Sequence, residues 1–205
     1  MIRTFIATLA VLVIGAAAFA SLTHGFTTMT AETARRQTVA ARPIAIPPLA
    51  GLDQLGHHQA LANADDARVA IVDFIYTRCT SICLALGDSY QQLQSQILAA
   101  HLERRLRLVT VSFDPEHDTR EVIADYADRM RVNPLVWTVL TPDDPEQLQA
   151  ALTTFGVIVR PADRGQFVHN AAFNILDRRG RLARIVPIDQ PALALQVAGE
   201  ISARP

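Results

Sequence analysis

The chain has 205 residues, half of them hydrophobic, and a net charge of −1. This length and composition fit one domain with a full core plus an N-terminal extension, and the charge excludes the broad basic surface of a nucleic-acid-binding protein. All nineteen basic residues are arginine. Chemistry that needs lysine, such as Schiff-base formation or P-loop phosphate binding, is therefore excluded as well.

The N-terminal segment is strongly apolar. Residues Phe5–Leu22 are rich in Ala, Val, Ile and Leu, follow Arg3, and contain a small-x-small sequence at Ala18–Ala20. The run is near the lower limit of about 17 residues for a membrane span, and its pattern also suits a secretory signal peptide. We therefore predict that residues 1–22 are a signal peptide or a membrane anchor, outside the fold.

Residues 23–48 are polar and contain the pairs Arg35-Arg36, Arg42-Pro43 and Pro47-Pro48, so we interpret them as a linker. Residues 49–205 then form the domain. Residues 51–66 are predicted to be a turn-rich entry. The adjacent His57 and His58 in it could suggest a metal site, but neighbouring side chains on an extended chain face opposite ways, so we predict a solvated loop.

Both cysteines follow a buried strand. The run Val69–Tyr76 is short, β-branched and aromatic, which predicts a strand. After Cys83 the apolar residues recur at helical spacing. Cys79 and Cys83 thus lie where a strand turns into a helix, and the unpaired N–H groups and dipole at a helix start favour the thiolate form.

Two thiolates four residues apart share a helical face, so they can form a disulfide or hold one metal ion. Soft sulfur ligands select Cu(I), zinc or an iron–sulfur cluster. Closed zinc sites and clusters need four ligands, whereas Cu(I) accepts two or three. A structural disulfide or two inert core thiols are the alternatives without a catalytic or metal role.

Further strands and helices alternate along the chain. A second buried strand is predicted over Leu106–Phe113 and a glycine turn at Arg178–Gly180. The other predicted elements are helices from Thr119 to about Met130, from Asp144 or Pro145 to Phe155, and over Gln190–Ala203, and strands over Val136–Leu140, Phe167–Asp177 and Arg181–Ile188. This order predicts an α/β fold with a central mixed sheet flanked by helices, of the thioredoxin-like type, with Cys79 at the carboxyl end of a strand.

His169 is the candidate third ligand. Two thiolates and one imidazole make a three-coordinate site that can hold Cu(I), or Cu(II) with distortion or an added oxygen. The second ring nitrogen of His169 then needs a hydrogen-bond acceptor. The rival His117 lies among acidic residues and is predicted to be an exposed loop residue or a partner of Asp114 or Glu116.

Several motifs together resemble the SCO/SenC copper chaperones over about residues 49–201. They are Asp73-Phe-Ile-Tyr-Thr-Arg-Cys79-x3-Cys83, Ser112-Phe-Asp-Pro-Glu-His-Asp-Thr119, Trp137-Thr-Val-Leu-Thr141, Phe155-Gly-Val and the segment from His169 to Leu182. The resemblance implies a thioredoxin-like fold, membrane tethering outside the cytoplasm, copper bound by Cys79, Cys83 and His169, and a role in maturing the copper A centre of cytochrome c oxidase.

The chain also departs from the usual family pattern. Thr80 and Leu84 replace the prolines that usually follow the two cysteines, and Val168-His169-Asn170 replaces Asp-His-Ser. The three ligands implied by the resemblance are present, while the surface around them differs.

Two functions are therefore weighed. A metallochaperone would hold copper on Cys79, Cys83 and His169 and pass it to an oxidase subunit or another copper protein, after receiving it from an upstream donor. A thiol–disulfide oxidoreductase would use Cys79 as the attacking thiolate and Cys83 as the resolving one, and would keep the cysteines of an apo-copper protein reduced. We expect an exported monomer on the periplasmic side of the inner membrane, with no nucleic-acid partner.

Overall fold

A computed structural model describes residues 2–22, 31–63, 65–79 and 82–204 of the chain. The chain divides into two compact units, residues 1–41 and 42–205. The first unit contains α1 (Ile2–Leu22) and α2 (Ala31–Ala41). Among the described residues, no helix combines the length and the apolar character that crossing a membrane requires.

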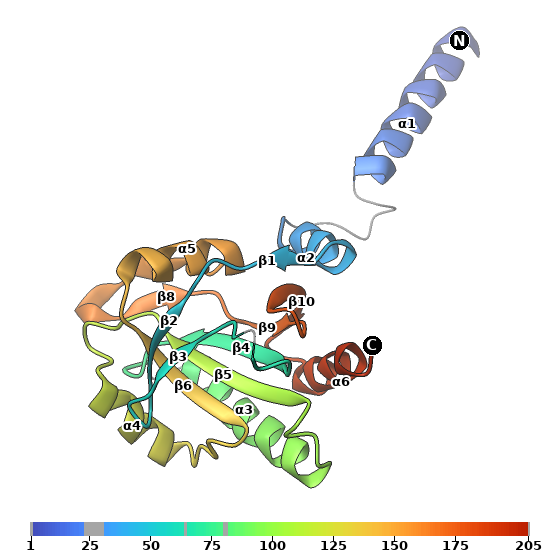
Figure 1. Ribbon diagram of the computed structural model, residues 1–205. Helices are drawn as coiled ribbons and strands as arrows, with labels where there is room; N and C mark the ends of the chain where they lie inside the picture. The colour runs from blue at the N-terminus through green and yellow to red at the C-terminus, as the bar shows by residue number, and fades with distance from the viewer. Residues whose placement is uncertain (1, 23–30, 64, 80–81, 205) are drawn as a thin grey trace. The chain divides into compact units, whose positions relative to one another are not determined.

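The second unit is built on one eight-stranded sheet with the strand order β1-β10-β9-β4-β5-β6-β2-β3 (Figure 1). Its centre, β4-β5-β6, is parallel, and β9 and β10 continue it as an antiparallel pair. The strands are β1 (Ile44–Ala45), β2 (Ala50–Asp53), β3 (His58–Ala60), β4 (Val69–Ile75), β5 (Leu106–Ser112), β6 (Trp137–Pro142), β9 (Ala172–Leu176) and β10 (Arg181–Pro187).

The central strands are buried because helices cover both faces of the sheet. Every residue of β4 is buried, as expected for a parallel strand in an α/β core. Figure 1 shows α5 on one side of the sheet and α3 on the other, and α6 packs against α3, β4 and β10. The helices of this unit are α3 (Ile82–Ala99), α4 (Arg120–Arg129), α5 (Pro145–Phe155) and α6 (Pro191–Ser202).

This architecture confirms the predicted thioredoxin-like fold. The boundaries of α5 follow from local chemistry: the Asp144 carboxylate accepts hydrogen bonds from the backbone N–H groups of Glu146 and Gln147, and Gly156 ends the helix in the left-handed region at φ 67°. α4 starts where the sequence predicted, with Thr119 in the N-cap position, but the Thr119 side chain makes no capping hydrogen bond to the helix.

Two predictions about local structure were wrong, and a third stays a prediction. The strand predicted over Phe167–Asp177 is interrupted at Asn170, so that β8 (Phe167–His169) separates from β9 and pairs instead with β7 (Val159–Pro161) as a two-stranded sheet. The range 23–48, for which the role of a linker stays a prediction, includes α2 and β1. The predicted entry loop contains β2 and β3, which extend the sheet beyond β6.

Candidate metal and thiol site

The strand-to-helix turn that carries the cysteines is present as predicted. β4 ends at Ile75, Tyr76 is buried, and a turn leads to Cys79, which is only 6% exposed and whose N–H donates to the Tyr76 carbonyl at 3.2 Å. α3 begins at Ile82, so Cys83 is the second residue of the helix. The side chain of Cys83 lies outside the described part of the chain, and the predicted pairing of the two sulfurs therefore stays a prediction.

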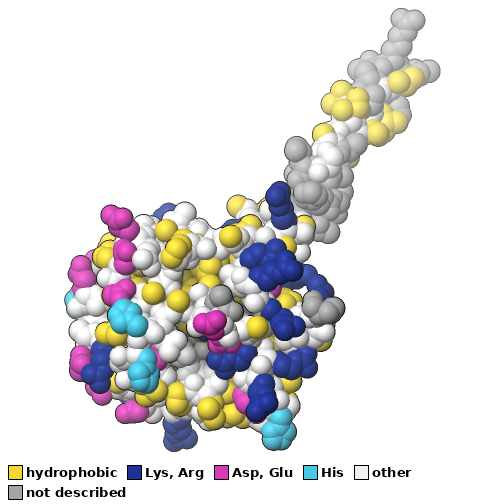
Figure 2. Space-filling model, viewed as in Figure 1, with side chains coloured by type: hydrophobic (Ala, Val, Ile, Leu, Met, Phe, Trp, Pro, Cys, Tyr) yellow, Lys and Arg dark blue, Asp and Glu magenta, His cyan; other side chains and the backbone are white. Residues whose placement is uncertain are grey.

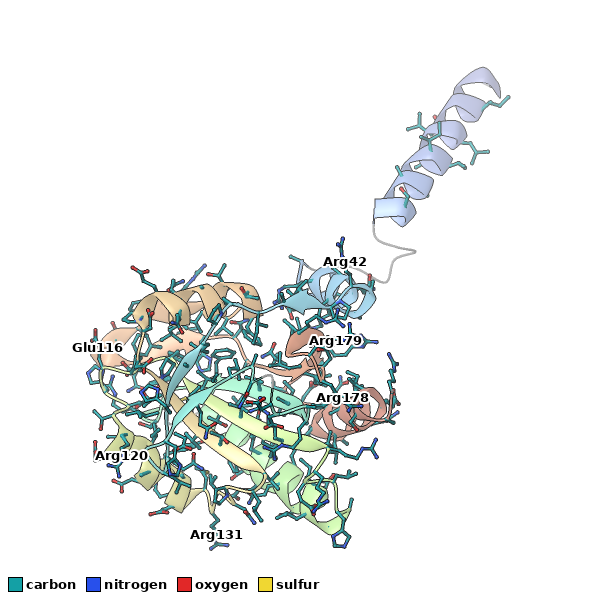
Figure 3. The ribbon with its side chains drawn as sticks, viewed as in Figure 1. Arg42, Glu116, Arg120, Arg131, Arg178 and Arg179 are labelled. Atoms are coloured by element: carbon teal, nitrogen blue, oxygen red, sulfur yellow. The ribbon has the colours of Figure 1, made fainter. Side chains whose placement is uncertain are left out.

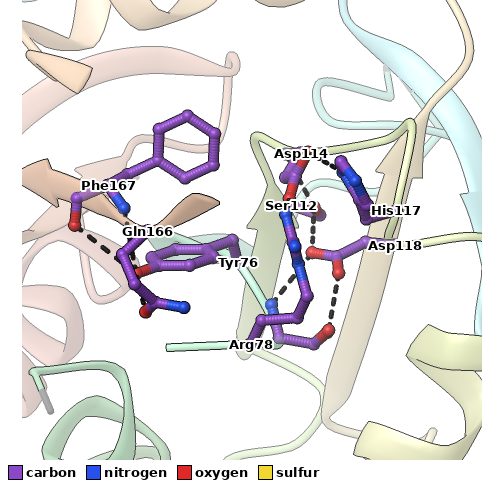
Figure 4. Close-up of polar contacts among 9 residues, drawn as sticks. Tyr76, Arg78, Ser112, Asp114, His117, Asp118, Gln166 and Phe167 are labelled. Atoms are coloured by element: carbon purple, nitrogen blue, oxygen red, sulfur yellow. Dashed lines mark hydrogen bonds and ion pairs between the residues drawn. The ribbon is translucent and has the colours of Figure 1, made fainter. Parts of the chain in front are cut away.

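A buried carboxylate fixes this turn. Asp118, fully buried, accepts hydrogen bonds from the backbone N–H of Thr77 at 3.0 Å, from the Thr77 hydroxyl, and from the Ser112 hydroxyl at 2.6 Å (Figure 4). The loop after β5 is thereby joined to the residues just before Cys79. Asp118 could not be singled out from the sequence, because nothing in the local pattern separates it from the other acids of that loop.

A second acid in the same loop, Asp114, contacts two nitrogen-bearing side chains. The Asp114 carboxylate lies 2.7 Å from the Arg78 guanidinium and 2.8 Å from His117 Nδ1 (Figure 4). His117 is thus an exposed partner of Asp114, one of its two predicted states. Glu116 is exposed at the surface (Figure 3). The ion pair with Asp114 therefore holds the side chain of Arg78, which precedes Cys79 in the chain, against this loop.

His169 lies at the end of β8, half-buried against two aromatic rings. Its ring centroid is 4.9 Å from that of Phe113 and 6.1 Å from that of Tyr76, both in edge-on contacts. Burial lowers the pKa of His169 below its ordinary value, and its backbone hydrogen bond at Asn170 offsets part of this shift. The imidazole is therefore held in its neutral form, which is the form that binds metals.

The tautomer of His169 follows from its hydrogen bond. Nδ1 lies 3.1 Å from the Asn170 carbonyl oxygen, and because a carbonyl only accepts, Nδ1 carries the proton and the lone pair is on Nε2. The Asn170 carbonyl is thus the acceptor that a metal-binding His169 was predicted to need. A neutral imidazole with a fixed Nε2 lone pair suits metal coordination.

His169 packs at the same edge of the main sheet as Cys79. Tyr76 follows β4 and Phe113 follows β5, and these two parallel strands end side by side, with Ile75 opposite Ser112. Because His169 packs on both aromatic residues, the hairpin brings it to the carboxyl ends of the strands where Cys79 lies. Among the described residues, which leave out the Cys83 side chain, no group of three His, Cys, Asp or Glu is arranged to hold a metal ion.

The other predicted and charged features lie elsewhere. His57 and His58 are exposed, as predicted, and lie 3.5 and 3.4 Å from Asp53 and Asp143. On the face shown in Figure 2, most arginines lie toward one side of the second unit. A cavity of about 710 Å³ at the amino ends of β4 and β5 is lined in part by Arg68, Arg104, Arg105 and Arg178, at the opposite end of these strands from Cys79.

Comparison with known proteins gives one consistent result. A protein-family model described as SCO1/SenC matches residues 52–201. The SCO1 protein homolog of Bacillus subtilis is 25% identical over 141 residues, which cover 68% of this chain and 72% of the relative.

Solved structures of the same kind share the fold. BsSco, a Sco-family cytochrome c oxidase assembly protein in which a disulfide switch was identified, superposes with a TM-score of 0.68 at 21% identity, over 80% of this chain and 96% of that one. Bradyrhizobium japonicum ScoI with copper bound gives a TM-score of 0.61 at 20% identity, over 77% and 99% of the two chains.

Proposed function

Because the chain belongs to the SCO1/SenC family, we propose that it is a copper metallochaperone that helps to assemble the copper A centre of cytochrome c oxidase. Copper, as Cu(I) or Cu(II), is its cargo, held by the sulfurs of Cys79 and Cys83 and by Nε2 of His169. The copper-bound state of the similar Bradyrhizobium ScoI supports this choice of metal.

The observation that carries the proposal is the state of His169. It is neutral, it packs on residues that follow β4 and β5, and its Nδ1 proton is held by a backbone carbonyl. A histidine with a purely structural role would not need all three of these features at the edge of the sheet where Cys79 lies. Two soft thiolates with one imidazole suit Cu(I) and leave the ion open to ligand exchange with a receiving protein.

A thiol–disulfide oxidoreductase is the second candidate, favoured by the position of the cysteines at the start of α3 and by the disulfide switch identified in BsSco. The Cys79 thiolate would attack a disulfide of the recipient and displace one of its thiolates. Cys83 would then attack the Cys79 sulfur of the mixed disulfide and release the second recipient thiolate. The recipient gains two electrons, and a Cys79–Cys83 disulfide remains.

Burial favours the metal role over this alternative. Cys79 is 6% exposed, whereas an attacking thiolate must reach a disulfide on another protein. A copper ion needs only enough access for ligand exchange. We further propose an exported monomer held at or released near the periplasmic side of the inner membrane by residues 1–22, with a copper-receiving oxidase subunit as its partner.

The test is copper stoichiometry and affinity, measured anaerobically on the reduced chain. The proposal predicts one copper per chain, with clearly weaker binding in Cys79→Ser, Cys83→Ser and His169→Ala. The matched control is His117→Ala, which removes another imidazole of the same region and should leave affinity within about twofold. Binding that is indifferent to His169 would refute the three-ligand site and leave the oxidoreductase.

A further inference from the structure

The hairpin that carries His169 is not part of the main sheet. β7 and β8 pair only with each other, with Val159 opposite His169 and Pro161 opposite Phe167. In the described part of the chain no strand ladder joins this hairpin to the eight-stranded sheet. Apart from the chain itself, which enters β9 at Ala172, its position relative to Cys79 therefore depends on side-chain contacts.

The base of the hairpin is held by Asn170. Its side-chain oxygen accepts from the Ile158 N–H at 2.7 Å, and its amide nitrogen donates to the Gly156 carbonyl at 2.9 Å. These bonds close the hairpin at the end of α5. They fix one point of it, and the orientation of the rest needs a second point of attachment.

Tyr76 provides that second point. Its hydroxyl donates to the Gln166 side-chain oxygen at 2.9 Å and accepts from the Phe167 N–H at 3.2 Å (Figure 4). Its ring meets Phe167 edge-on at 5.2 Å and His169 at 6.1 Å. Tyr76 is 2% exposed and directly follows β4, so its own position is fixed by the core.

We propose that Tyr76 is a positioning residue that sets the place of His169 relative to Cys79. Tyr76 belongs to the strand end that leads to Cys79, three residues further on. Its side chain binds the hairpin that carries His169. The inference rests on the proposed function, because positioning matters only if both residues bind copper. Without the hydroxyl, His169 occupies its binding position for a smaller fraction of the time, and apparent affinity falls in proportion.

The first readout is amide exchange in the copper-free chain carrying Tyr76→Phe, which keeps the ring and removes the hydroxyl. The Phe167 N–H loses its hydrogen-bond acceptor, so we expect its exchange to become about tenfold faster. The matched control is Tyr90→Phe, which removes a buried hydroxyl that donates to the Ile71 carbonyl at 3.1 Å inside the core. That variant should leave Phe167 exchange unchanged.

The second readout is a double-mutant cycle on copper affinity. Tyr76→Phe should weaken copper binding about three- to tenfold, in line with the loss of one or two hydrogen bonds, and should add nothing when His169→Ala is already present. The Tyr90→Phe control should stay within about twofold of the unsubstituted chain.

The outcomes separate this inference from the proposed function. If His169→Ala leaves affinity unchanged, the three-ligand function is refuted and the positioning role with it. If His169→Ala weakens copper binding while Tyr76→Phe changes neither affinity nor Phe167 exchange, only the inference fails. Equal weakening by Tyr76→Phe with and without His169 would also overturn it, since Tyr76 would then act through the thiolates.

Discussion

Asp73 gives a direct test of the physical account of the core. It lies in the middle of β4, opposite Thr110 on β5, is 2% exposed, and its Oδ1 has no hydrogen-bond partner among the described residues. Burial raises the pKa of this carboxyl from 3.8 to about 7, and hydrogen bonds at Thr110 and Tyr90 offset only part of the shift. The folded protein therefore holds a proton on Asp73 that the unfolded chain releases near pH 4.

The sign and size of the effect follow from linkage. A raised folded-state pKa contributes stability that is fully present below the unfolded pKa and is lost as the pH rises through the folded one. A shift of about 3 units corresponds to roughly 4 kcal/mol in total, of which about 3 kcal/mol is lost between pH 5 and pH 8. Asp73→Asn keeps the shape and removes the charge.

We therefore expect the unfolding free energy of Asp73→Asn, relative to that of the native chain, to increase by about 3 kcal/mol from pH 5 to pH 8. The assay is urea unfolding of both reduced chains at several pH values, followed by the fluorescence of the fully buried Trp137. A difference between the two proteins that stays constant with pH would refute the reasoning, because Asp73 would then ionise alike in the folded and unfolded states.

Two further predictions concern the loops around the site. Asp118→Asn removes the charge and replaces the oxygen that accepts from the Thr77 hydroxyl with an amide N–H₂, so it should lower the unfolding free energy by about 1–3 kcal/mol, as urea unfolding would reveal. It should also weaken copper binding in a titration; unchanged affinity would mean that the turn before Cys79 does not need this anchor. Asp144→Ala removes the N-cap of α5 and should cost about 1 kcal/mol without changing copper affinity, so a large loss of affinity in this variant would contradict the placement of the site.

The parts of the fold that the sequence predicted are those governed by local patterns. The continuous apolar run of β4 and the extent of α5, from Asp144 or Pro145 to Phe155, are visible in the sequence, and the structure places them as predicted. The interruption at Asn170 was missed because its cause is tertiary: its amide group binds Ile158 and Gly156, 12 and 14 residues away. A strand pattern alone cannot report such contacts.

The candidate site divides in the same way. Cys79, Cys83 and His169 are chemically distinctive, so the sequence could single them out. Asp118 and Tyr76 were missed because their partners lie 41 and about 90 residues away in sequence. Their residue types are ordinary in a loop and a buried strand, and only the fold shows that one fixes the cysteine turn and the other holds the histidine hairpin.

X-ray absorption spectroscopy of the Cu(I)-loaded chain reports the ligands of the copper ion. We predict two sulfur ligands and one nitrogen ligand, with the nitrogen lost in His169→Ala and retained in His117→Ala. A copper shell with sulfur ligands alone, or a nitrogen contribution that survives the loss of His169, would contradict it.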